Sequence, residues 1–88
     1  MLTVTDDAAR FLAELLYEAD TTDAKSAIRF VREGRTINPI LDHERPGDAT
    51  YGYAGITVLL LDEDVIAEFE DKTLDVEDTE EGLQLILL

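Results

Sequence analysis

The spacing of apolar residues near the start of the chain predicts an amphipathic helix. Its apolar positions follow the i, i+3, i+4, i+7 spacing of one helical face: Ala8, Phe11, Leu12, Leu15, Leu16 and Ala19. Thr5 suits the N-cap position, and Asp6 and Asp7 follow in the first turn, where the helix dipole favours negative charge. The polar residues 20–23 prefer turns and are expected to end the helix.

Alternating and continuous apolar runs in the middle of the chain predict strands. Residues 27–32 alternate and form the first long strand. Residues 36–41 form a weaker strand, which must be an edge or carry a bulge because Pro39 has no N–H to donate. Residues 51–55 are irregular or a short bent strand. The almost unbroken apolar run 56–61 is typical of a central strand buried on both faces.

The last third of the chain predicts a short helix followed by two strands. Asp62 caps a helix that extends to about Glu70, and residues 73–77 and 83–88 alternate as strands. The expected fold class is therefore α+β and mostly β, with a small mixed or antiparallel sheet system. The predicted core takes the apolar positions that these periods select: Phe11, Leu12, Leu15, Leu16, Ile28, Phe30, Ile56, Val58, Leu60, Ile66, Phe69, Leu74, Val76, Leu83 and Leu85.

The amino-acid composition excludes several classes of function. The chain has 88 residues, a length typical of one domain, and it has no cysteine, which excludes disulfides, thiolate metal sites and a thiol nucleophile. The N-terminus lacks the basic and apolar segments of a signal peptide, and no apolar run is long enough to span a bilayer. We expect a soluble, cytoplasmic protein.

The net charge of −14 is extreme for this length. Its sign opposes binding to nucleic acid and to anionic membranes. Only Lys72 is basic after Pro46, so the acidity is concentrated in the second half. This pattern indicates a solvated surface that aids solubility or adapts the chain to high salt, or a docking face for a basic protein or for cations. The uncharged C-terminal edge Leu85–Leu88 predicts self-association, most simply as a homodimer.

Four segments together resemble the A-type iron–sulfur carriers, also called HesB-like domains. They are LTVTDDAARFLAELL, AIRFVREG, ITVLLLDEDVIAEFEDKTLD and EEGLQLIL. The resemblance covers most of the chain and implies a single HesB-like domain over residues 1–88. It also implies the family's fold, a small mixed-sheet sandwich or pseudo-barrel with an N-terminal helix and a short helix near residues 62–70.

The chain departs from this family at the cluster ligands. The family places a cysteine shortly after the first long strand, and here Ile37 or Asn38 is nearest to that position. Its other two cysteines lie in a tail beyond the final strand, whereas this sequence ends at Leu88. The resemblance therefore supplies no ligand residue, and thiolates of this chain cannot hold an iron–sulfur cluster.

His43 is a weak candidate metal ligand. It is the only histidine and lies between Asp42 and Glu44, which are both oxygen donors. In an extended segment, alternation points these two carboxylates away from the imidazole, and no second histidine is present for a facial triad. A surface position is the simpler interpretation.

Asp62, Glu63 and Asp64, with Glu68, are the other candidate cation ligands. The segment lacks the sixth-position glycine and the twelve-residue spacing of an EF-hand loop. A helix cap flanked by solvated carboxylates explains it better, and weak, salt-sensitive divalent binding remains the alternative.

Arg29, Arg32 and Arg35 are close enough in sequence to form an anion site, although pairing with the chain's own carboxylates is the favoured interpretation. Tyr51 and Tyr53 are interpreted as packing residues rather than a ligand-facing patch.

The sequence contains no pattern that indicates catalysis. There is one serine and no local Ser/His/Asp arrangement, so we expect no enzyme activity and no cofactor. The expected function is a non-enzymatic protein-interaction module. The alternative is carboxylate-based binding of iron or another divalent cation.

Overall fold

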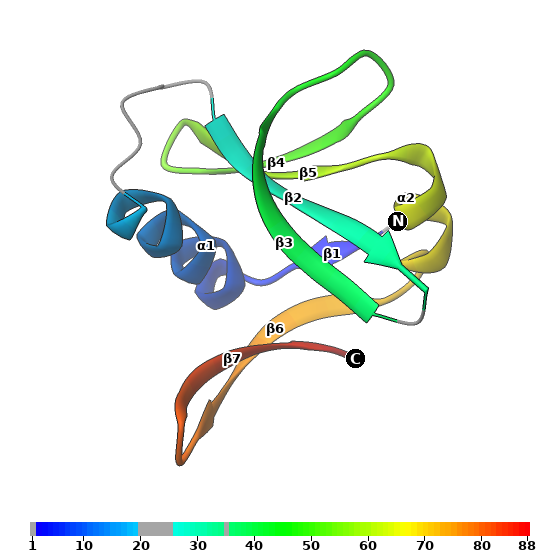
Figure 1. Cartoon of the computed structure of the whole chain (residues 1–88). Helices are drawn as coiled ribbons and strands as arrows, with labels where there is room; N and C mark the ends of the chain where they lie inside the picture. The colour runs from blue at the N-terminus through cyan, green and yellow to red at the C-terminus, as the bar shows by residue number, and fades with distance from the viewer. Residues whose placement is uncertain (1, 20–25, 35) are drawn as a thin grey trace.

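The computed structural model describes residues 2–19, 26–34 and 36–88 (Figure 1). The elements follow in the order β1 (Thr3–Val4), α1 (Asp6–Glu18), β2 (Ser26–Glu33), β3 (Thr36–His43), β4 (Ala49–Tyr53), β5 (Ile56–Leu61), α2 (Glu63–Glu68), β6 (Thr73–Thr79) and β7 (Gly82–Leu87). Among these residues, no helix is long and apolar enough to cross a membrane.

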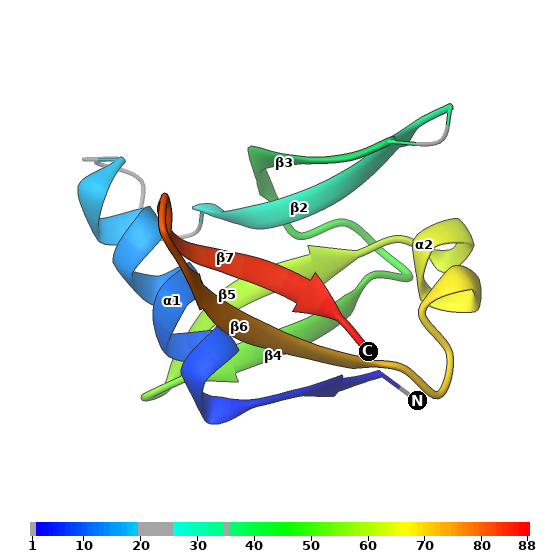
Figure 2. The ribbon, with the colours of Figure 1, turned by 90° about the horizontal axis from the view of Figure 1, so that it is seen from below.

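The strands form two mixed sheets. The first has the order β1-β6-β7, with β1 parallel and β7 antiparallel to β6. The second has the order β3-β2-β5-β4, in which only the central β2–β5 pair is parallel. Figure 1 shows the β6–β7 hairpin below the larger sheet, and Figure 2 shows it in front of that sheet, with α1 along one side of both. Helix α1 contacts strands of each sheet. The predicted α+β, mostly β class is confirmed.

Helix α1 begins where the sequence predicts. The Thr5 hydroxyl accepts a hydrogen bond from the Ala8 N–H at 3.1 Å, and Asp6 and Asp7 occupy the first turn. The same hydroxyl donates to Asp75 Oδ1 at 2.9 Å, which ties the start of the helix to β6. The cap therefore fixes the position of α1 as well as its first residue. The residues expected to end the helix, 20–23, lie outside the described part of the chain.

Strand β5 is the centre of the core, as predicted. It lies between β2 and β4, and its residues Val58–Leu61 are all fully buried. The core also includes apolar residues outside the predicted core set: Leu2, Ala8, Ala9, Ala27, Leu59, Leu61 and Val65. Val65 lies in α2, whose N-cap is Asp62, as predicted.

Two residues of the predicted core are exposed. Ile56 is 59% exposed and Leu83 is 51% exposed. Each lies at the first or second position of its strand, close to the preceding turn. The apolar pattern of the strand continues to these two positions, but no other part of the described structure buries them. Figure 1 shows the β6–β7 turn, which precedes Leu83, projecting from the rest of the molecule.

Irregularities expected in two strands are present. Pro39 lies in β3, an edge strand, where its missing N–H costs no ladder hydrogen bond on the outer side. Strand β4 is short, and its register against β5 shifts between Tyr51 and Gly52, as in the bent-strand alternative. It begins at Ala49, two residues before the predicted segment, and residues 54 and 55 form the turn to β5.

Candidate functional site

A buried arginine connects β2 to the loop between β3 and β4. Arg29, on β2, is 3% exposed. Its Nε donates to Asp42 Oδ2 at 2.8 Å, while Nη1 and Nη2 donate to the two carboxylate oxygens of Asp48 at 2.9 and 2.5 Å. Nη2 also donates to the carbonyl oxygen of His43 at 3.1 Å. The guanidinium thus forms a bidentate pair with Asp48 and a second pair with Asp42.

This pairing holds the loop between β3 and β4. Arg45 adds a second cation, donating from Nη2 to Asp42 Oδ2 at 2.7 Å and from its backbone N–H to Asp48 Oδ2 at 2.7 Å. The Asp48 N–H returns a hydrogen bond to the Arg45 carbonyl at 3.1 Å. Two arginines and two aspartates make an electrically balanced group, which we call the Arg29 network: Arg29, Asp42, Arg45 and Asp48.

The Arg29 network keeps its carboxylates ionised. Hydrogen bonding from Arg29 is the main cause that lowers the pKa of Asp48. The pKa of Asp42 is lowered first by the hydrogen bond from the His43 backbone N–H and then by Arg29. The pairing in turn raises the pKa of Arg29 above that of a free guanidinium. The network therefore stays charged but internally neutralised at any pH near neutrality.

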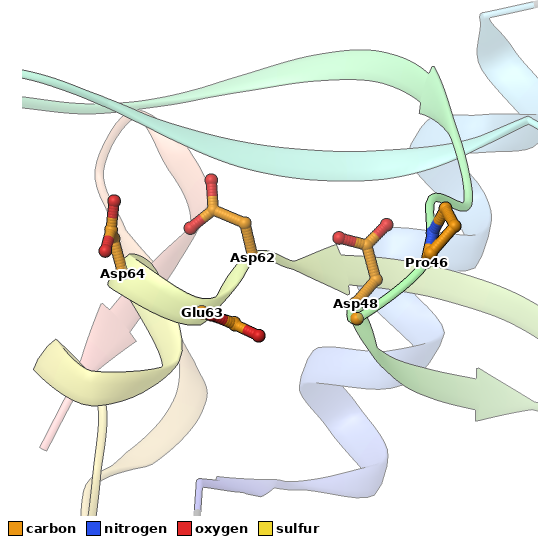
Figure 3. A pocket seen from close by; sticks show the side chains of 6 residues that line it. Pro46, Asp48, Asp62, Glu63 and Asp64 are labelled. Carbon is orange, nitrogen blue, oxygen red and sulfur yellow. The ribbon is translucent and has the colours of Figure 1, made fainter.

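A pocket of about 270 Å³ adjoins this network and is lined by carboxylates (Figure 3). Figure 3 shows Asp48 on one side and the segment Asp62–Asp64 on the other. Pro46 and Gly47 complete the lining, and Gly47 has a φ of +88°, a conformation that favours glycine. Three of the residues predicted as cation ligands, Asp62, Glu63 and Asp64, therefore line one pocket with Asp48.

Two of these four carboxylates already have partners within the protein. Asp62 Oδ1 accepts the N–H of Val65 at 3.0 Å as the N-cap of α2, and Asp48 is paired with Arg29. Glu63 and Asp64 are exposed. Across the described residues, no group of three or more His, Asp or Glu side chains has a geometry that could hold a metal ion. The pocket is an acidic recess, not a closed coordination site.

His43 does not line this pocket. It is the last residue of β3 rather than part of a loop, and its backbone N–H donates to Asp42 Oδ1 at 2.8 Å. The backbone of His43 thus contacts both Arg29 and Asp42. Asp48 is the residue that sequence reasoning missed, because it is isolated in a turn and nothing local signals a partner on another strand.

Arg29 and Arg32 do not form an anion site. Arg29 is buried against its own carboxylates, as the favoured interpretation predicted, whereas Arg32 is exposed, pairs with Glu68 and donates to the Gly34 carbonyl at 2.9 Å. Positions 29 and 32 differ by an odd number, so the two side chains leave opposite faces of β2. Arg35 lies outside the described residues.

Two other predictions concern uncharged residues. Tyr51 and Tyr53 pack against the hydrophobic core, and burial raises the pKa of Tyr51. Ile37 and Asn38 are the residues nearest to the position where the resemblance expects the first cysteine. Ile37 packs against the core and Asn38 is half-buried, and neither can supply a thiolate.

The fold is of the class expected for the A-type carriers. Among solved structures, the chain is similar to the crystal structure of Escherichia coli SufA, which is described as involved in the biosynthesis of iron–sulfur clusters. The match has a TM-score of 0.69 and 16% sequence identity, and it covers 99% of this chain and 83% of the SufA chain. No protein-family model and no curated protein matches the sequence. At this identity, the similarity establishes the shared fold alone.

Proposed function

We propose that this protein is a non-enzymatic interaction module, built on the fold of an iron–sulfur biosynthesis protein and unable to ligate a cluster through thiolates. The observation that carries the proposal is a SufA-like fold over 99% of a chain that contains no cysteine. A protein that has this fold but no thiolate ligand can still act by binding other proteins through its surface. That surface carries most of the net charge of −14.

The acidic second half of the chain is the docking face in this proposal. Its carboxylates are exposed at Glu63 and Asp64, beside the pocket, and continue along the outer side of β6. A basic partner gains both a faster encounter and a defined orientation from such a field. The internally balanced Arg29 network positions the loop at the pocket without contributing net charge of its own.

The test is capture followed by reconstitution. The immobilised full chain retains a partner from an extract of its source, and the purified partner is then titrated by calorimetry. We expect the double variant Glu63→Gln and Asp64→Asn to bind at least about tenfold more weakly, which corresponds to about 1.4 kcal/mol. The matched control is Glu14→Gln with Glu18→Gln on α1, which removes the same charge from another face. Equal affinity for both double variants would contradict the assigned face, and no reconstituted binding would contradict the function.

Cation binding is the competing function, favoured by the four carboxylates around one pocket. Titration of Fe²⁺, Mn²⁺ and Ca²⁺ into the apo protein at moderate salt separates the two. A stoichiometric micromolar site, about −8 kcal/mol, would support cation binding. Heat no larger than diffuse screening would support the interaction module. The existing partners of Asp48 and Asp62 favour the second outcome.

A further inference from the structure

An apolar cavity of about 500 Å³ is lined by residues of both sheets. Phe11 and Leu15 of α1, Ile37 of β3 and Leu85 of β7 are among its lining residues, and Gln84 is the polar side chain at its wall. This volume lies within the range of about 300–1,000 Å³ typical of ligand pockets. Figure 1 shows β7 below β2 and β3, the strands that supply lining residues from the other sheet.

One wall of the cavity is a strand with an unused edge. Strand β7 ends its sheet, and no strand among the described residues pairs with its outer side. Thr73 and Leu88 exchange both backbone hydrogen bonds, at 3.0 and 2.8 Å. Because bonded and non-bonded pairs alternate in an antiparallel ladder, the N–H and C=O groups of Leu83, Leu85 and Leu87 point outward.

Strand β3, on the opposite wall of the cavity, is less suited to pair with an added strand. Strand β3 is also an edge, but Pro39 lines the cavity there and has no N–H. An extended chain entering the cavity therefore finds regularly spaced outward donors and acceptors along β7, whereas β3 contains a residue without an N–H.

The charged residues around β7 determine which kind of polypeptide segment can bind at its edge. The strand carries no charge from Gly82 to Leu88, and Leu83 and Leu87 are 51% and 39% exposed. Its neighbour β6 presents Glu77 opposite Gln84 in the ladder, and the turn between the strands contains Glu80 and Glu81. A second copy of the chain carries the same net charge of −14, so electrostatic repulsion opposes the pairing of two β7 edges. An added strand with basic residues meets no such repulsion.

We propose that the β7 edge binds an extended segment of a partner protein by strand addition. The bound segment alternates apolar side chains, which enter the cavity, with Lys or Arg side chains on the outer face near Glu77. Backbone hydrogen bonds to Leu83, Leu85 and Leu87 supply affinity, while the alternation supplies specificity. This inference rests on the proposed interaction function and assigns it a binding mode and a partner chemistry.

Selection from a random peptide library against the full chain at physiological ionic strength tests the partner chemistry. We expect enrichment of alternating apolar and basic residues. A selected peptide, made synthetically, should shift the backbone amide resonances of residues 83–87. Methylating its alternate backbone nitrogens should abolish binding, a result that does not depend on how any variant of the chain folds.

Leu83→Pro and Leu83→Ala are the matched pair on the chain itself. Proline removes an outward donor and leaves the ladder to β6 intact, so the peptide should bind at least about tenfold more weakly. Alanine keeps that donor and should bind within about threefold of the parent chain. Far-UV circular dichroism confirms that both variants are folded. Glu77→Gln should weaken binding and reduce its dependence on salt.

Several outcomes would overturn the inference. They are an empty selection, a selected peptide that tolerates backbone methylation, or a dimer at the same ionic strength that the peptide cannot dissociate. If the Glu63 and Asp64 double variant weakens binding of the reconstituted partner but Leu83→Pro does not, the strand-addition site is contradicted and the interaction function is supported. If no partner binds to the parent chain, both proposals are contradicted.

Discussion

At the scale of single residues, Arg29 determines the shape of the loop beside the acidic pocket. Its two carboxylate partners lie 13 and 19 residues further along the chain, and both are brought to it by strand pairing. The sequence predicts pairing of this arginine with carboxylates but not its burial or its partners. Alternation places position 29 on a face of β2, and only the tertiary structure shows that the β3–β4 loop covers that face.

Replacing Arg29 with methionine should destabilise the protein strongly. The change leaves the Asp48 side chain, which is 4% exposed, without its countercharge. Removing one partner of a buried ion pair costs about 3–5 kcal/mol. Chemical unfolding of Arg29→Met measures the loss, with Arg32→Gln as the control, because the Arg32–Glu68 pair is half-exposed and is worth about 1 kcal/mol or less. Equal stability of the two variants would contradict the role assigned to the Arg29 network.

The lowered pKa values of Asp42 and Asp48 predict acid sensitivity. A folded-state pKa below the unfolded value of about 4 means that the unfolded chain takes up protons first as the pH falls. This contribution to stability is present above about pH 4 and is lost as the pH falls through the folded-state pKa.

Protonation of the other carboxylates relieves repulsion in a chain of charge −14, so the comparison must be differential. Asp48→Asn removes one of the two groups. We expect the stability difference between parent and variant to be largest near pH 6 and to shrink as the pH falls below about 4. Thermal unfolding across this range measures it, and a difference that stays constant with pH would refute the assignment.

At the scale of elements, the sequence predicts most of the helices and strands because their signals are local. The Thr5 and Asp62 caps lie where short side chains precede acidic first turns, and β5 is recognisable from its continuous apolar run. The sequence does not predict where a covering layer ends, which is why Ile56 and Leu83 were assigned to the core. Nor does it predict that β1 pairs with β6, since these strands are about 70 residues apart.

Truncation of one buried and one exposed apolar side chain on β5 tests which positions of the strand belong to the core. Leu60 is fully buried, so Leu60→Ala should cost about 2–5 kcal/mol of unfolding free energy. Ile56, in the same strand, is 59% exposed, and Ile56→Ala should cost less than about 1 kcal/mol. Urea unfolding of both variants gives the comparison. An unchanged stability of Leu60→Ala would show that β5 is not the centre of the core.

At the scale of the whole molecule, fold and charge act in opposite ways on association. Strand β7 has no charged residue, and no strand among the described residues pairs with its outer edge, which favours association. The net charge of −14 opposes association, because two copies repel each other. The fold class followed from the order of segments. The Arg29 network and the acidic pocket did not, because each joins residues from loops and strands that are distant in sequence.

Salt should decide whether two copies of the chain pair through β7. At low ionic strength, long-range repulsion keeps the protein monomeric, and at about 1 M salt the Debye length falls to about 3 Å, which leaves only contacts at the edge itself. The exposed Leu83, Leu87 and Leu88 then favour a homodimer, so that the edge proposed to bind a partner segment takes a second copy. Light scattering should report a monomer at low salt and a doubled mass at high salt. Leu87→Lys should remain monomeric at both, whereas Ile56→Lys, on the other sheet, should still dimerise. A parent chain that stays monomeric at high salt would show that the β7 edge does not drive self-association.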